Sequence, residues 1–258
     1  MINTLSRAVE EQFGINADPD NVKKLEAYLL ETYGAINGEL IKKVFSSGEA
    51  AGFLTVNETY FFREPAHFAL LRDLLPSYAE TGLHVCCAAV ATGCEAYSLA
   101  MLIEAYNKGA EKPVYYHIDA FDLNPKVIET ANQGVYGERA LREDGSCFHY
   151  MANPYLKSAD SGHRVDPVLR KNIRFFTHNL MDELPGKGYD IIFFRNALIY
   201  FTMQSRERVL SHLHAALREG GLLFVGVSET SRVQFAGLEG KNRNDVFYFG
   251  KSSQFTDA

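Results

Sequence analysis

The sequence lacks the signals of several protein classes. It has no tryptophan, only 4 cysteines and 8 prolines in 258 residues, and no C-x-x-C pair. Without that spacing neither a zinc site nor a disulfide framework is indicated, so we expect no metal. Cys86 and Cys87 lie within an apolar run, while Cys94 and Cys147 stand alone. We interpret all four as small residues of the core.

Long apolar runs and an excess of basic residues are also missing. No run approaches the roughly 20 residues that span a bilayer, so we expect no membrane insertion. The start, MINTLSRAVEEQF, has no basic region followed by an apolar stretch and is therefore no secretory signal. These observations predict a cytoplasmic protein. The net charge is −6, whereas nucleic-acid-binding domains usually carry a clustered basic excess. Nucleic acid is therefore not expected as the main partner.

The first part of the chain reads as short helices. Apolar residues recur at helical spacing over 5–13 and 22–30, and Gly34 is a stop signal for the second of these helices. A third helix is expected over 39–45. No strand pattern occurs in this region, so residues 1–50 are interpreted as a short helical N-terminal domain.

From about residue 83 strand and helix patterns alternate. Strands are expected over 83–90, 114–124, 172–180, 190–201, 220–229 and 245–252, with helices over 95–108, 125–132 and 203–217. This alternation predicts an α/β fold with a mostly parallel sheet covered on both faces. Residues 137–171 are rich in Gly, Pro, Asp and Ser, and we expect an irregular insertion or long connection at the sheet's edge. It would belong to a domain spanning 51–258.

The turn after the first strand indicates which ligand the sheet holds. A dinucleotide fold would show G-x-G-x-x-G there, but Ala91-Thr92-Gly93-Cys94-Glu95 has one glycine, which disfavours a dinucleotide. Asp122 ends the second strand, where an acidic side chain can accept hydrogen bonds from ribose hydroxyls. One glycine and one acid suit a nucleoside cofactor without phosphate, such as S-adenosylmethionine. A strand-end aspartate is as often a helix cap, so the pattern alone leaves that alternative open.

Five blocks of residues resemble one enzyme family. From about residue 52 to the end the chain is similar to the chemotaxis receptor glutamate methyltransferases, the CheR family. The blocks are 57–65 (NETYFFREP), 91–98 (ATGCEAYS) and 120–124 (AFDLN), then Asn179-Leu180 with 194–201 (FRNALIYF), and 221–224 (GLLF) with Ser228-Glu229. The resemblance implies a Rossmann-like S-adenosylmethionine-dependent methyltransferase fold that releases S-adenosylhomocysteine.

The same resemblance implies roles for the matching residues. In the family's pattern Asn57, Thr59 and Arg63 border the methionine end of the cofactor and the acceptor carboxylate, and Tyr200 faces the reacting centre. Glu95 and Asp122 hold polar groups of the cofactor, Asp122 the ribose, beside the Gly93 turn. Asn179 and Leu180 flank the adenine, and Asn196 with Ala197 lines the cofactor. As alternatives, Asn179 and Asn196 are simple turn or cap residues, and Arg63-Glu64 is a surface ion pair.

Two departures from the family's pattern concern the cofactor site. The usual G-E-E-P-Y-S is here 93–98 (GCEAYS), which has lost one acid and the proline, and 122–124 (DLN) replaces D-I-D. The expected contacts remain, with a lower affinity for the cofactor as the expected effect.

The resemblance also implies the reaction and its acceptor. A glutamate carboxylate is already ionised at neutral pH, because its reference pKa is about 4.3. Its attack on a sulfonium methyl requires alignment and no general base. Arg63 is the candidate for gripping that carboxylate, with Tyr200 as a second donor. The implied partners are the cytoplasmic helices of methyl-accepting chemotaxis receptors. Two alternatives stay open: a methyltransferase with another protein or small-molecule acceptor, and a non-catalytic cofactor-binding regulator. The sequence does not specify an oligomeric state.

Overall fold

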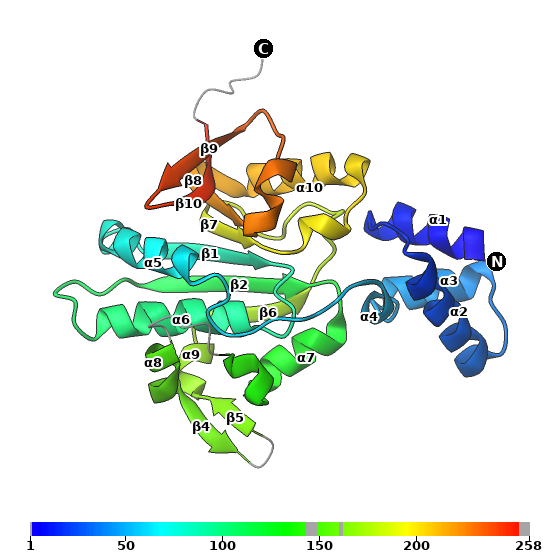
Figure 1. Ribbon diagram of the computed structural model, residues 1–258, viewed down its shortest axis with the longest axis horizontal. Coiled ribbons are helices and arrows are strands. Elements are labelled where there is room, and N and C mark those ends of the chain that lie inside the picture. The colour runs from blue at the N-terminus through cyan, green and yellow to red at the C-terminus, as the bar shows by residue number, and fades with distance from the viewer. Residues whose placement is uncertain (1, 143–148, 160–161, 253–258) are drawn as a thin grey trace.

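The computed structural model describes residues 2–142, 149–159 and 162–252, so the predicted core position of Cys147 lies outside the described residues. A seven-stranded sheet with helices on both faces forms the main body, and a group of short helices lies at one end of it (Figure 1). The strands are β1 (Leu83–Ala88), β2 (Tyr116–Asp122), β6 (Ile173–Thr177), β7 (Tyr189–Phe194), β8 (Leu217–Val225), β9 (Leu238–Arg243) and β10 (Val246–Lys251).

The sheet order is β6-β2-β1-β7-β8-β10-β9, and its first five strands run parallel. From β1 the chain winds outward to β2 and β6, then returns to the other side of β1 with β7 and β8. The winding direction therefore reverses between β1 and β7, which is where ligands bind in open α/β sheets. This order confirms the predicted α/β class with a mostly parallel, Rossmann-like sheet.

Side chains of the central strands alternate between two cores. On β1, Val85 and Cys87 belong to one buried cluster, together with helices α5 (Pro65–Leu74) and α6 (Cys94–Asn107). Cys86 and Ala88 belong to the other cluster, which includes residues of α10 (Met203–Ala216). Period-two alternation along a strand therefore gives both faces apolar residues, as a sheet covered on both sides requires. Helix α7 (Pro125–Gln133) follows β2.

The N-terminal helices are α1 (Ile2–Phe13), α2 (Pro19–Tyr33), α3 (Gly38–Ser46) and α4 (Ala51–Leu54). Asp18 caps α2 by accepting hydrogen bonds from the backbone N–H groups of Asp20 and Asn21, and Gly34 ends the helix in a left-handed conformation. The apolar faces of the four N-terminal helices are buried in the same cluster as Cys86 and Ala88. The N-terminal helices thus share a core with one face of the sheet.

The expectation of irregular structure over residues 137–171 was wrong. Strands β3 (Val135–Tyr136), β4 (Leu156–Ala159) and β5 (Gly162–Val165) form a separate antiparallel sheet in the order β3-β5-β4, flanked by α8 (His149–Ala152) and α9 (Pro167–Arg170). These strands are too short for a readable alternation, and only Val165 and Tyr136 among them are buried. Because these strands are short and contain glycine and polar residues, the sequence pattern did not predict them.

Strand β9 was also not predicted, because its sequence LEGKNR is polar. Its residues pair along their length with β10, and only Leu238 is buried. Five short 3-10 segments complete the described structure: η1 (Leu75–Tyr78), η2 (Glu138–Leu141), η3 (Asn153–Tyr155), η4 (Leu198–Tyr200) and η5 (Val227–Arg232). No helix among the described residues is both long and apolar enough to cross a bilayer.

Candidate functional site

A cavity of about 920 Å³, counting the space that is open to solvent, lies where the sheet's winding reverses. Its walls come from the segments that follow β1, β2, β6 and β7, from the loop over 55–63, and from the segment after α1. A concave site at this point of an α/β sheet is where a ligand or cofactor is expected. The carboxyl ends of the parallel strands thus form the floor of a ligand site.

The structure brings almost all of the predicted site residues together. Those lining the cavity are Asn57, Thr59, Arg63, Glu95, Asp122, Asn179, Leu180, Asn196, Ala197 and Tyr200. Gly93 is not among them. It precedes α6 with a φ of 89°, and an added Cβ would lie 2.8 Å from the Cβ of Ala131 and 3.1 Å from Phe175. Gly93 therefore allows α6 to start and to pack closely on its neighbours, without lining the cavity.

Asp122 fixes the turn that faces it. Its carboxylate accepts hydrogen bonds from the backbone N–H of Ala91 at 2.9 Å and of Asn124 at 3.0 Å. Asn124, and not Asp122, caps α7. Burial raises the pKa of Asp122, and the bonds from Asn124 and Ala91 offset part of that shift. Each carboxylate oxygen keeps a further acceptor position, so Asp122 holds the β1 turn and can still receive hydroxyl donors from a ligand.

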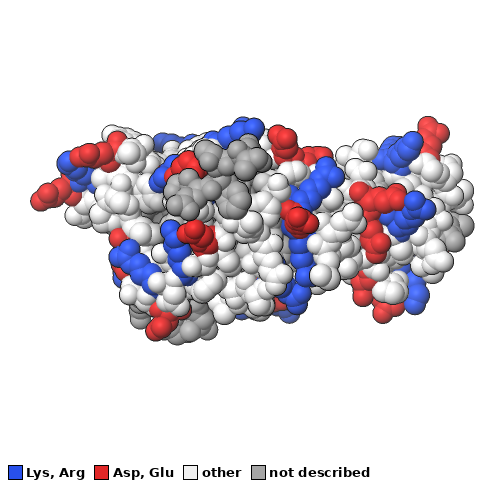
Figure 2. All heavy atoms as spheres, turned by 90° about the horizontal axis from the view of Figure 1, so that it is seen from above, with Lys and Arg blue, Asp and Glu red and all other residues white. Residues whose placement is uncertain are grey.

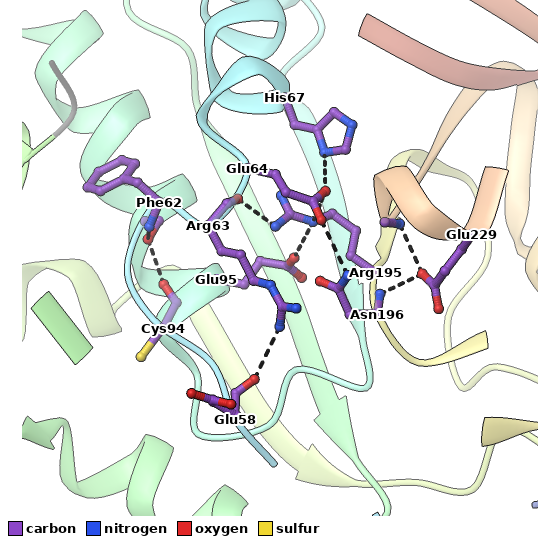
Figure 3. Close-up of polar contacts among 12 residues, drawn as sticks. Glu58, Phe62, Arg63, Glu64, His67, Cys94, Glu95, Arg195, Asn196 and Glu229 are labelled. Carbon is purple, nitrogen blue, oxygen red and sulfur yellow. Dashed lines mark hydrogen bonds and ion pairs between the residues drawn. The ribbon is translucent and has the colours of Figure 1, made fainter. Parts of the chain in front are cut away.

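A buried arginine joins two walls of the cavity (Figure 3). The Arg195 side chain is 2% exposed, and its Nε lies 3.2 Å from Oε2 of Glu95 and 4.0 Å from Oε2 of Glu64. Its Nη2 donates to the backbone carbonyl of Arg63. Burial raises the pKa of Glu95, and Arg195 counteracts that rise. One buried cation therefore serves two carboxylates and holds the loop that carries Arg63.

His67 faces the same group and stays neutral. Its Nδ1 lies 3.4 Å from Glu64, and its ring packs edge-on against Phe224. Burial, with the nearby charge of Arg195, lowers the pKa of His67 to about 3.

Glu229 shapes the wall that follows β7. This fully buried carboxylate accepts hydrogen bonds from the backbone N–H groups of Asn196 at 2.6 Å, Gly226 at 3.0 Å and Ile199 at 3.2 Å. Asn196 has a left-handed φ of 57°, and its side-chain amide donates to Glu64 at 3.3 Å. Three donors on one carboxylate stabilise this strained turn, which presents Asn196 and Ala197 to the cavity.

Arg63 and Tyr200 line the cavity from opposite segments of the chain. The Arg63 guanidinium donates to the backbone carbonyl of Glu58 at 3.2 Å and lies over the ring of Tyr60. The Tyr200 hydroxyl is 3.5 Å from the carbonyl of Val56. The alternative interpretation of Arg63-Glu64 as an ion pair is wrong, since Glu64 is oriented toward His67 and Arg195 instead. Arg63 thus forms no direct ion pair among the described residues, although its positive charge helps to lower the pKa of Glu95.

The N-terminal segment closes one side of the site, which the sequence reading did not anticipate. Phe13 and Ile15 line the cavity although they are 2% and 4% exposed. Asn16 donates through its backbone N–H to the carbonyl of Tyr200 at 2.8 Å, and through its side chain to the carbonyls of Tyr200 and Phe201. The predicted site residue Asn179 also contacts this segment, because its side chain donates to the carbonyl of Gln12. The same side chain accepts a hydrogen bond from the backbone N–H of Met181 and so caps that turn.

His178 and Arg195 were also missed, although both stand next to predicted residues. His178 lines the cavity, and its buried Nε2 has no hydrogen-bond partner among the described residues. Burial lowers the pKa of His178, so its ring is a neutral donor or acceptor. His178 directly precedes the Asn179-Leu180 block and Arg195 lies inside FRNALIYF, so adjacency was the one signal available. The helical spacing of Phe13 indicates only a core position, and Ile15 lies outside that pattern.

One group with metal-ligand chemistry lies away from the cavity, near the amino-terminal ends of β1 and β2. Ligand atoms of His84, His117 and Asp119 fall within 4.8 Å of one another. Asp119 accepts hydrogen bonds from Arg174 at 2.8 Å and from Tyr189 at 2.8 Å. Burial raises the pKa of this carboxyl. The hydrogen bonds from His84, Arg174 and Tyr189 lower the pKa by more than burial raises it, so the net shift is downward. A full set of donors therefore satisfies Asp119 as an anion.

Comparison with known proteins identifies relatives over most of the chain. The family model described as "CheR methyltransferase, SAM binding domain" matches residues 57–242. A "Chemotaxis protein methyltransferase" of Listeria monocytogenes is 34% identical over 202 residues, 77% of this chain and 74% of that protein. A "Probable biofilm formation methyltransferase WspC" of Pseudomonas aeruginosa is 31% identical over 220 residues, 81% of this chain and 51% of that protein.

Among solved structures, the magnesium protoporphyrin IX methyltransferase of Synechocystis with bound SAM aligns over 92% of this chain and all of that chain. Its identity is 15% and its TM-score 0.39. A likeness this distant adds nothing to the fold described above.

Proposed function

Because the chain belongs to the CheR methyltransferase family, we propose that it methylates glutamate side-chain carboxylates of methyl-accepting chemotaxis receptors. The family establishes a methyltransferase that uses S-adenosylmethionine through this domain. The observation that carries the proposed acceptor is the match to a chemotaxis protein methyltransferase over three quarters of both chains. The matched residues include the loop with Arg63 and the segments that follow the strands of the parallel sheet.

The residues of the cavity fit S-adenosylmethionine. Apolar side chains of Phe13, Ile15, Phe121 and Leu180 suit a purine ring, and the buried Nε2 of His178 is a polar atom still without a partner. A mostly apolar pocket with a few placed polar groups is typical of a cofactor site. The chemistry of the donor set therefore agrees with a nucleoside that carries a charged amino acid end.

We assign the cofactor's parts to residues of this cavity on the family's pattern. Asp122 would accept hydrogen bonds from the ribose hydroxyls, since its carboxylate keeps free acceptor positions beside the β1 turn. Glu95 would bind polar groups at the methionine end. Asn179 with Leu180 would flank the adenine, and Asn196 with Ala197 would border the cofactor from the wall that Glu229 holds. Asn57 and Thr59 would lie beside the methionine end, next to the acceptor.

The reaction is a direct transfer between two charged groups. S-adenosylmethionine supplies a methyl group bound to a positively charged sulfur. A carboxylate oxygen of the acceptor forms a bond to the methyl carbon while the carbon–sulfur bond breaks and its electron pair stays on sulfur. No proton moves, because the glutamate is already ionised at neutral pH. The chain therefore needs to orient the acceptor and to exclude water, and no general base is required.

Arg63 and Tyr200 are proposed to orient the acceptor carboxylate. Arginine can bind a carboxylate through two parallel hydrogen bonds, and Arg63 forms no direct ion pair of its own among the described residues. Arg195 acts behind it by holding the backbone carbonyl of Arg63. Tyr200 contributes a second donor from η4. A grip that is too strong would lower the electron density of the nucleophile, so Arg63 is expected to orient the carboxylate without fully neutralising it.

Docking of the acceptor and the division of the chain follow from the same proposal. We propose that residues 1–50 form a helical domain that helps dock receptor helices, and that residues 51–258 form the methyltransferase domain. Acidic and basic side chains are mixed over the N-terminal helices on the face seen at the right of Figure 2. Since the proposed partners are cytoplasmic helices, the proposal places the protein in the cytoplasm.

Transfer of labelled methyl groups tests the acceptor. The chain is incubated with methyl-labelled S-adenosylmethionine and a membrane fraction that contains chemoreceptors, mild alkali is added, and volatile methanol is counted. Methyl esters of carboxylates are labile to alkali, so we expect methanol from receptor bands. Alkali-stable label would indicate methylation of nitrogen and would contradict the glutamate assignment.

A second candidate is a CheR-type methyltransferase with a different acceptor. The observation that favours it is the similarity to a protein named for biofilm formation over 81% of this chain. Label on a protein other than the receptors would support this candidate. Cofactor binding without any transfer would instead support a regulator that binds S-adenosylmethionine and has no activity.

A further inference from the structure

A second hollow adjoins the cofactor cavity on the side of the small sheet. It measures about 940 Å³, counting the space open to solvent, and η2 and the residues beside it form one wall. Asn57, Glu58 and Thr59 line both hollows. This short segment is therefore the shared boundary between the cavity and the outer groove, and a chain lying in the groove would reach the cavity past it.

Glu58 is held at that boundary by two arginines. Arg142, from the outer groove, forms an ion pair with the Glu58 carboxylate, and Arg63, from the cavity, donates to the Glu58 backbone carbonyl at 3.2 Å. Both guanidinium groups lie over the ring of Tyr60, at 5.3 Å for Arg142 and 5.8 Å for Arg63. A glutamate of the chain itself thus occupies Arg142, the cation on the groove side of the segment that Arg63 holds from the cavity.

The other charged residues that line the groove are Arg139 and Glu138. Arg139 lines it and makes no ion pair among the described residues. Glu138 lines it too, but its carboxylate is bound by His163 at 2.9 Å. The charged lining is therefore two arginines and two glutamates, and both glutamates already have partners, so Arg139 is the guanidinium left to attract an incoming carboxylate.

We propose that this groove binds an acidic peptide segment carrying the acceptor glutamate, and that the segment displaces Glu58 from Arg142. This inference rests on the proposed function and specifies how the acceptor reaches the site. The exchange replaces one carboxylate by another on the same guanidinium, so no buried charge is left unpaired. Glu58 thereby acts as a specificity-determining residue, because a neutral segment gains nothing by displacing it.

The pair that must open is a weak one. The side chains of Arg142 and Glu58 are 49% and 58% exposed. Exposed ion pairs contribute little to stability, about 0.2–1 kcal/mol, so removing the competing carboxylate should strengthen peptide binding by about twofold to fivefold. Salt screens such contacts, so the difference should shrink at high ionic strength.

Binding of a labelled peptide tests the proposal without requiring turnover. The probes are a fluorescein-labelled peptide of alanine and glutamate and its glutamine counterpart, measured by anisotropy with S-adenosylhomocysteine present. We expect Glu58→Gln to tighten binding of the glutamate peptide and Arg142→Gln to weaken it, each by about twofold to fivefold. The glutamine peptide should bind weakly and should not respond to either substitution.

Matched controls come from the opposite end of the sheet. Glu80 and Lys112 form an exposed ion pair at 2.8 Å before β1 and β2, so Glu80→Gln and Lys112→Gln change the net charge equally at a distance from the groove. Both should bind the peptide as the unaltered chain does. The proposal is overturned if the glutamate peptide does not bind, if both peptides bind alike, or if the controls shift binding as much as the groove variants.

Transfer assays separate this inference from the proposed function. Peptide binding that follows the charge of residues 58 and 142, without methyl transfer to receptors, would leave the groove assignment standing and contradict the proposed function. Receptor methylation with an acceptor KM that is unchanged in Glu58→Gln and Arg142→Gln would support the proposed function and contradict the groove assignment.

Discussion

In the proposed mechanism, Arg63 is the residue on which orientation of the acceptor depends most. Replacing it by alanine removes the bidentate donor while Arg195 still holds the loop backbone. Because small errors of alignment are costly in a transfer reaction, kcat at saturating cofactor should fall by about 100-fold in Arg63→Ala. Arg63→Lys keeps the charge but not the two-pronged geometry and should be intermediate. Near-normal turnover of Arg63→Ala would remove this residue from the mechanism.

His67 makes the stability of the chain depend on pH. Its pKa of about 3 in the folded chain lies below the 6.5 of an unfolded chain, because burial and Arg195 disfavour its charged form. The depressed pKa means that stability is complete above pH 6.5 and is lost as pH falls toward 3. Between pH 7 and pH 5 the loss from this one group should be about 2 kcal/mol.

Denaturant unfolding at several pH values checks this expectation. In His67→Asn the unfolding free energy should decrease less between pH 7 and pH 5 than in the unaltered chain. Burial also lowers the pKa of His178 and His214, so part of the dependence should remain. An identical pH dependence in the two chains would show that His67 is not the source.

At the scale of elements, the start of α6 depends on one glycine. Gly93 has a φ of 89°, and a Cβ there would press on Ala131 and Phe175. Gly93→Ala should therefore lower the free energy of unfolding by roughly 1–3 kcal/mol through crowding and backbone strain. Gly109→Ala is the matched control, since nothing lies within 4 Å of its added Cβ. Equal stability of both variants in urea titrations would refute the packing role.

The elements that the sequence predicted well are those with strong apolar patterns and clear ends. β1 and β2 are buried except at His84 and His117, and α2 has Asp18 before it and Gly34 after it, so their bounds lie within a few residues of expectation. β9 was missed because its pairing with β10 comes from backbone hydrogen bonds, which place no demand on polar side chains facing solvent.

Site residues could be predicted where they belong to a sequence motif. They could not be predicted where tertiary packing alone brings them to the cavity. Asp122 was expected from its place at the end of a strand and Arg63 from the resemblance of its block to a family, and both line the cavity. Ile15 reaches the cavity because the chain folds back onto Phe201, a contact between residues far apart in sequence. Arg195 was read as part of a motif, but its ion pair with Glu95 depends on how β7 and α6 meet. Contacts of this kind leave no periodic signal.

At the scale of the whole molecule, the N-terminal segment and the sheet build one site. Asn16 bonds to the carbonyls of Tyr200 and Phe201, and Thr202 donates to the carbonyl of Gly14. Asn16→Ala removes its two side-chain bonds, at about 0.5–1.5 kcal/mol each, and should weaken S-adenosylhomocysteine binding several-fold in calorimetry. Asn21→Ala, in α2, changes the same residue type away from the cavity and should bind normally. Equal affinities of Asn16→Ala and Asn21→Ala for S-adenosylhomocysteine would show that the N-terminal segment does not contribute to cofactor binding.

The central claim is that this cavity directs methyl groups to glutamate carboxylates of chemotaxis receptors. The most direct measurement is peptide mass spectrometry of receptors incubated with S-adenosylmethionine and either the unaltered chain or Arg63→Ala. We predict methyl esters on glutamate side chains of the receptors' cytoplasmic helices, removable by mild alkali and almost absent with Arg63→Ala. Methyl groups on lysine or arginine nitrogen, or receptors left unmodified while the cofactor is bound, would contradict the claim.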